Sequence, residues 1–166
     1  MKEKVIIGII STFLHLTLSS ALAAGATEKV TGSVTFQNNQ SDTVVRCYEI
    51  TAHESTATRP AKGNIHWWAY AEDNSYVAEA TWEVIDTKVE GNEVWVKSVC
   101  TGAFGDFPSS YVGWYYYVHI VDNSTPGNEG DVLETKWSTS PNLNPHFISY
   151  SRKSIVAGNF KVHTRK

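Results

Sequence analysis

The sequence contains few charged residues and little excess of either sign. Only 19 % of its residues are charged, whereas 42 % are hydrophobic. This composition excludes an intrinsically disordered chain, which combines low hydrophobicity with a high net charge. The 14 Lys and Arg residues against 17 Asp and Glu residues give a net charge of −3. Without a basic excess the chain lacks the surface that neutralises several phosphates, so we expect a folded domain with no nucleic-acid partner.

Long apolar runs are also absent beyond the first residues of the chain. Lys2 and Lys4 precede an apolar stretch over residues 5–18, and small residues follow up to Ala23. This pattern predicts a signal peptide over residues 1–24 and an exported product, either periplasmic or extracellular. The stretch has about 14 residues, fewer than the roughly 20 that span a bilayer, and an uncleaved anchor is the alternative. No later segment is apolar enough to cross a membrane, so we expect no membrane span once the signal is removed.

Helical patterning is nearly absent from residues 25–166. No window of 11 residues places apolar side chains at i, i+3, i+4 and i+7. Apolar and polar residues alternate instead, as in 29–37, where Val30, Val34 and Phe36 share one side. The segments predicted as strands are 29–37, 43–53, 64–71, 76–88, 93–100, 111–121, 131–137, 147–151 and 159–164.

Eight or nine short strands joined by turns predict one all-β domain over residues 25–166. Two architectures fit, an antiparallel β-barrel and a β-sandwich. Segments 29–37 and 159–164 are both short and amphipathic, so their pairing would close the sheet and remove its exposed edges. This favours the barrel.

Cysteine is scarce, with only Cys47 and Cys100 in the chain. In an exported protein an even pair is consistent with a disulfide. Closing a loop of about 54 residues would stabilise the fold by roughly 4 kcal/mol. The alternative is two free thiols on strands that never approach each other.

The second half of the chain carries a series of short motifs. Gly91-Asn92 is followed by Val99-Cys100, then by Val121-Asp122-Asn123, Pro126-Gly127 and Asp131. This order resembles a family of small exported bacterial proteins of unassigned function, over about residues 64–164. The resemblance implies an antiparallel β-barrel and no particular activity.

Oxygen-bearing side chains are concentrated between residues 122 and 131. A calcium ion takes six to eight oxygen ligands at ~2.3–2.6 Å, and side chains of this kind can supply them. The spacing differs from that of an EF-hand, and the alternative is a hairpin loop whose polar side chains bond to the backbone. Calcium is the one cofactor that the sequence suggests, and its predicted ligands are Asp122, Asn123, Asn128, Glu129 and Asp131.

Aromatic residues are abundant, with six Trp and eight Tyr. Trp67 and Trp68 are adjacent on a predicted strand, so they point to opposite faces of the sheet. At least one of them therefore lies outside the primary core or is covered by a loop. We predict that a carbohydrate or small apolar ligand binds to aromatic side chains on one sheet face, namely Trp68, Tyr70, Tyr115 and Tyr117. The alternative is a structural or surface-interaction protein whose aromatic rings only pack.

Catalytic motifs are missing from the sequence. No Gly-x-Ser-x-Gly or His-Glu-x-x-His pattern occurs. Glu79 and Glu83 share a strand face, but i and i+4 positions lie about 13–14 Å apart, beyond the ~5–9.5 Å of glycosidase carboxylate pairs. A non-catalytic protein is therefore the first interpretation, and a small hydrolase or isomerase with a pocket in the barrel mouth is a further alternative. The oligomeric state is left open.

Overall fold

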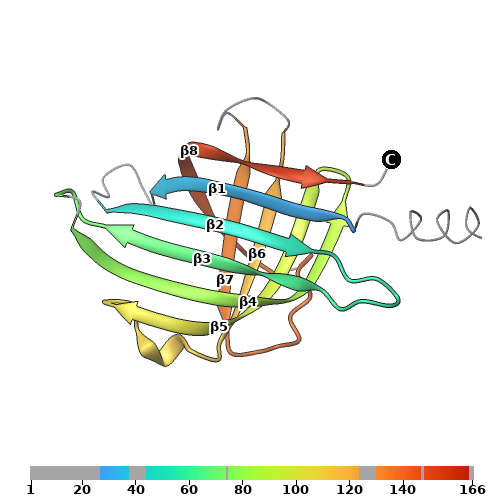
Figure 1. The fold of residues 1–166 in the computed structure, drawn as a ribbon, viewed down its shortest axis with the longest axis horizontal. Helices are drawn as coiled ribbons and strands as arrows, with labels where there is room; N and C mark the ends of the chain where they lie inside the picture. The colour runs from blue at the N-terminus through green and yellow to red at the C-terminus, as the bar shows by residue number, and fades with distance from the viewer. Residues whose placement is uncertain (1–26, 38–43, 74, 124–129, 147, 165–166) are drawn as a thin grey trace, which may run out of the picture.

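The chain forms a closed barrel of eight antiparallel strands (Figure 1). The computed structural model describes residues 27–37, 44–73, 75–123, 130–146 and 148–164. Each strand pairs with the next along the chain, and the last pairs back with the first, as the terminal segments predicted. The strands are β1 Lys29–Gln37, β2 Val45–His53, β3 Lys62–Tyr70, β4 Tyr76–Glu90, β5 Glu93–Gly105, β6 Tyr115–Val121, β7 Val132–Ser138 and β8 Ser151–His163. The predicted barrel is confirmed, and the sandwich is not formed.

The alternation of side chains decides which face of each strand lies inside. In β1, Val30, Val34 and Phe36 are almost completely buried, while the polar residues between them are more exposed. Gly32 shares the inner face, and a Cβ there would lie 2.8 Å from the ring of Phe160. The glycine therefore leaves room for a core ring contributed by β8, which pairs with β1 at this position.

The core changes character along the barrel axis. The half nearer the β4–β5 turn is filled mainly by aliphatic side chains such as Val94, Ile120 and Leu133, all 0 % exposed. The other half is aromatic, with Trp82 and Tyr116 at its centre. The two halves are parts of one hydrophobic cluster, so one core serves the described barrel.

Several predicted strands have different boundaries in the structure. Residues 109–111 form the short 3-10 helix η1, and Gly113 at a φ of 87° turns the chain so that β6 begins only at Tyr115. The segments predicted at 147–151 and 159–164 are replaced by one long strand, β8. Its burial does not alternate cleanly, so sequence periodicity could not reveal its full length. In the described part of the chain, no helix has the length and hydropathy needed to cross a membrane.

The predicted disulfide is wrong, because Cys47 and Cys100 are both free thiols. Cys47 lies on β2 next to the inward-facing Tyr48, so its side chain points outward and contacts the hydroxyl of Thr35 at 3.9 Å. Cys100 lies on β5 within the interior cluster and is 2 % exposed. The two side chains therefore occupy opposite sides of the barrel wall, on strands that are not neighbours.

Candidate binding site in the barrel mouth

A cavity of about 650 Å³ lies at one end of the barrel. Among the described residues, every strand except β5 contributes to its walls, together with the β5–β6 and β7–β8 connections. Seven aromatic side chains line it, namely Phe36, Trp67, Trp82, Phe107, Tyr116, Trp137 and Tyr150. The candidate site is therefore the mouth of the barrel and not its outer wall.

Contacts between the rings hold the aromatic lining in place. Trp82 stacks on Tyr116 with ring centroids 5.0 Å apart and an interplanar angle of 25°. Trp137 lies 5.5 Å from Trp82 and 4.6 Å from Tyr116. Phe107 meets Trp67 edge to face at 5.4 Å. Such contacts favour a preformed surface on which a flat molecule can stack.

Strand register explains why these rings point inward. Trp82 lies directly opposite Ile65 on β3 and Cys100 on β5, both of which belong to the core. Residues opposite each other in an antiparallel pair share a face. Tyr116 hydrogen-bonds with the side chain of Thr135, and burial raises the pKa of its phenol, which therefore stays neutral. The lining thus presents uncharged rings.

Two cationic side chains share this inner face at the mouth. Arg46 lies opposite the buried Phe36, and Lys153 lies opposite the buried Leu133. Arg46 Nη1 donates to the carbonyl of Val44 at 3.0 Å, and Lys153 Nζ donates to Ser151 Oγ at 3.4 Å. Burial and, secondarily, the charge of Arg46 lower the pKa of Lys153.

The four aromatic residues predicted to bind a ligand lie on the outer wall and form two separate pairs. Trp68 and Tyr70 are on β3, whereas Tyr115 and Tyr117 are on β6, with β4 and β5 between those strands. Trp68 packs on His66 at 4.6 Å, and Lys97 Nζ lies 5.5 Å above the Tyr115 ring. The structure does not gather the four into one surface.

Tyr117 is completely buried despite its place on the outer wall. The segment between β7 and β8 covers it. Its hydroxyl donates to the carbonyl of Ser140 at 2.9 Å and accepts from the N–H of Leu143 at 3.3 Å. Tyr117 therefore anchors this segment to the barrel and offers no ligand surface.

The predicted calcium ligands Asp122, Asn123 and Asp131 lie at the end opposite the mouth, while Asn128 and Glu129 fall outside the described residues. The Asp131 carboxylate accepts the backbone N–H of Phe160 at 2.9 Å, and that of Asp122 accepts the N–H of Val162 at 2.8 Å. Within the described ranges, no three His, Cys, Asp or Glu residues are grouped so as to hold a metal ion. The two carboxylates thus serve β8, as the hairpin alternative anticipated in part.

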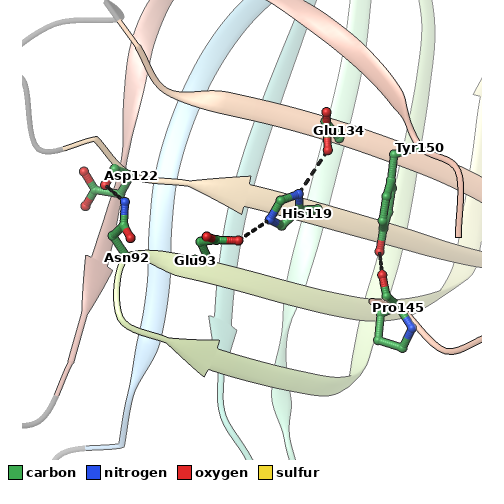
Figure 2. A network of polar contacts seen from close by, with 7 residues as sticks. All are labelled: Asn92, Glu93, His119, Asp122, Glu134, Pro145 and Tyr150. Carbon is green, nitrogen blue, oxygen red and sulfur yellow. Dashed lines mark hydrogen bonds and ion pairs between the residues drawn. The ribbon is translucent and has the colours of Figure 1, made fainter. Parts of the chain in front are cut away.

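A polar network on the outer wall escaped sequence reasoning (Figure 2). His119 on β6 contacts Glu93 of β5 through Nε2 and Glu134 of β7 through Nδ1, each at 3.0 Å. Trp95 stacks on the same imidazole with an interplanar angle of 11°. His119 lies directly opposite Trp95 and Glu134, so only the strand register reveals the cluster. Because carboxylates engage both ring nitrogens, the network ties three strands together and has no nitrogen left for a substrate.

No protein-family model, curated protein or solved structure matches this chain. The resemblance to the small exported bacterial proteins therefore stays a prediction. The functional conclusion depends on the geometry of the barrel mouth alone.

Proposed function

We propose that this protein binds, without chemical conversion, a small molecule with a flat apolar ring system in the mouth of its barrel. The observation that carries the proposal is the cavity of about 650 Å³ lined by seven aromatic side chains. Small-molecule sites typically enclose ~300–1,000 Å³, and barrel mouths are among their common locations.

The residues that line the cavity favour binding over catalysis, and they favour a ligand with a flat apolar ring over a carbohydrate. Its described residues include no His, Asp or Glu, the side chains that the hydrolase or isomerase alternative would need there. A sugar requires many hydrogen bonds, whereas the large faces here belong to Trp82, Tyr116 and Trp137. Stacking on such faces adds roughly 0.5–1.5 kcal/mol per ring pair beyond area burial. Export of the chain through residues 1–24 remains part of this proposal.

The binding test uses the neutral fluorescent probe N-phenyl-1-naphthylamine. We expect saturable enhancement of probe fluorescence together with quenching of Trp fluorescence. Trp137→Ala removes a partly buried ring of the mouth and is expected to weaken binding about tenfold, equivalent to ~1.4 kcal/mol. Trp68→Ala removes a similarly exposed ring from the outer wall and is expected to leave the affinity unchanged.

The same pair of variants can overturn the proposal. If only Trp68→Ala weakens binding, the outer wall carries the site. If the probe does not bind to the folded wild-type protein, the cavity is not a ring-binding site, and a structural or surface-interaction role takes its place.

A further inference from the structure

We propose that the barrel has a second binding site, at the end opposite the mouth, which holds a phosphate-like oxyanion on the outer wall between Lys29, His53 and Lys62. The ligand class is a doubly charged oxyanion, either in a small soluble phosphomonoester or in a lipid headgroup. None of the three residues lines the ring-binding cavity, so this site is separate from the proposed function of the mouth.

Strand register places one lysine on each side of a histidine. Lys29 begins β1 and Lys62 begins β3, and each lies directly opposite His53 at the end of β2. The three side chains point outward, because their neighbours Val30 and Ala52 fill the core. Adjacent strands lie about 4.8 Å apart, so the two lysines leave β1 and β3 roughly 10 Å apart. Their flexible four-carbon stems can bring both ammonium groups to an anion above the imidazole.

A cavity of about 310 Å³ adjoins this cluster. His53 and Lys62 line it together with Arg59 of the β2–β3 connection. Two backbone hydrogen bonds between Thr56 and Arg59, at 2.8 and 3.3 Å, hold that connection in shape. The guanidinium therefore adds a third positive charge at a defined place, beside a space large enough for a small phosphomonoester.

Carboxylates do not neutralise these cations. Among the ion pairs of the described residues, none includes Lys29, Arg59 or Lys62. Glu54 lines the cavity, but its Oε1 accepts the backbone N–H of Val89 at 3.0 Å, which holds the carboxylate against β4. The cluster thus keeps its positive charge although the whole chain carries a net charge of −3.

The imidazole of His53 experiences this positive charge directly. Burial lowers its pKa, and the charges of Lys29 and Lys62 lower it further. Its Nδ1 lies 3.2 Å from Thr27 Oγ1, and when that hydroxyl donates, Nε2 carries a proton for an incoming anion. A phosphomonoester brings about −1.5 to −2 charges and three acceptor oxygens, one for each of the three basic groups. Charge complementarity therefore favours a doubly charged oxyanion over a carboxylate.

The test uses sulfate, whose double charge stays constant while histidine titrates, and sodium chloride at equal ionic strength is the reference. NMR follows the imidazole resonance of His53, which is assigned by its loss in His53→Gln. We expect sulfate to raise the pKa of His53, because the anion favours the protonated ring. His146 is exposed on the β7–β8 connection and should titrate equally in both salts.

Charge-removing variants locate the anion. Lys29→Gln and Lys62→Gln are each expected to weaken sulfate binding about three- to fivefold. Without sulfate, each should raise the pKa of His53, because each lysine lowers it. Lys136→Gln removes an exposed charge from β7 at the mouth and should change neither quantity. Thermal melts of every variant establish that the compared proteins are folded.

Two further probes distinguish the sources of the oxyanion. Glycerol phosphate represents a soluble phosphomonoester, and phosphatidylcholine vesicles with added phosphatidic acid represent a lipid headgroup. Binding of glycerol phosphate that depends on Lys29 and Lys62 supports a soluble ligand, whereas the same dependence for the vesicles alone supports a membrane surface.

Two results would overturn the inference. One is that sulfate changes the pKa of His53 no more than chloride does. The other is that Lys136→Gln weakens sulfate binding as strongly as Lys62→Gln, which would reduce the cluster to general surface charge. Neither result bears on probe binding in the mouth, so the proposed function is tested separately.

Discussion

The carboxylate of Asp131 joins β8 to the rest of the barrel where the sheet ladder is incomplete. β7 and β8 pair only over Leu133–Thr135 and 151–153. Beyond these pairs, Asp131 accepts the N–H of Phe160 at 2.9 Å and that of Asn123 at 3.1 Å. The residue is 8 % exposed, so both bonds lie largely out of water. We therefore predict that removing this carboxylate destabilises the closed barrel.

The expected loss follows from the two hydrogen bonds. A hydrogen bond to a charged group contributes about 1.5–3 kcal/mol, so Asp131→Ala should lower the free energy of unfolding by about 3–5 kcal/mol. Asp131→Asn keeps one acceptor oxygen and should lose about half as much. Asp86→Ala is the control, because Asp86 is exposed and a substitution there should change stability by less than about 0.5 kcal/mol.

Urea denaturation followed by Trp fluorescence measures these differences, and each titration is repeated with calcium and with a chelator. A loss below about 1 kcal/mol for Asp131→Ala would refute the structural role of the carboxylate. An increase in wild-type stability with calcium that disappears in Asp131→Ala would instead establish the ion site predicted from the sequence.

Two further pairs of substitutions test side-chain packing and backbone geometry in the barrel. Tyr48→Phe removes a buried hydroxyl that has no hydrogen-bond partner among the described residues, so thermal melts should show equal or greater stability. Tyr116→Phe removes the hydrogen bond to Thr135 and should lower the free energy of unfolding by about 1 kcal/mol. Gly158→Ala places a Cβ 2.1 Å from the carbonyl oxygen of Ser33, so urea titrations should show a free energy of unfolding lower by more than about 2 kcal/mol. Gly91→Ala has open space around the added Cβ, so the free energy of unfolding should fall by only about 1 kcal/mol.

The barrel could be predicted from the sequence because it depends on a period of two residues. The clear alternation of apolar and polar residues in 29–37 and 76–88 predicted β1 and most of β4. The amphipathic character of the two terminal segments predicted the pairing of β1 with β8. The ends of the strands were harder to predict, because a turn such as that at Gly113 depends on backbone dihedral angles that the residue type only suggests. The two cysteines remain free thiols because their side chains lie on opposite faces of the barrel wall. The sequence does not show which face each cysteine occupies.

The binding site was less predictable because the sequence shows alternation but not curvature. Alternation placed Trp67 and Trp68 on opposite faces, yet both faces of the strand carried aromatic residues. Closure of the sheet made the face of Trp67 concave and that of Trp68 convex. The outer pairs were therefore predicted as the ligand surface, while the rings that share a cavity come from seven separate parts of the chain.

The two cations of the mouth differ in how far sequence reasoning could have reached them. Arg46 is in the same alternating series as the buried Tyr48, Ile50 and Ala52, so the sequence could have predicted a charged residue on the apolar face of β2. Lys153 was not, because β8 has a bulge: Ala157 pairs with Thr35 and Ile155 with Phe36, which leaves Val156 as an extra residue. The inward positions change there from even to odd numbers, so alternation counted back from Phe160 would place Lys153 outside the barrel. Only the pairing with β1 and β7 shows that this side chain lies on the inward face.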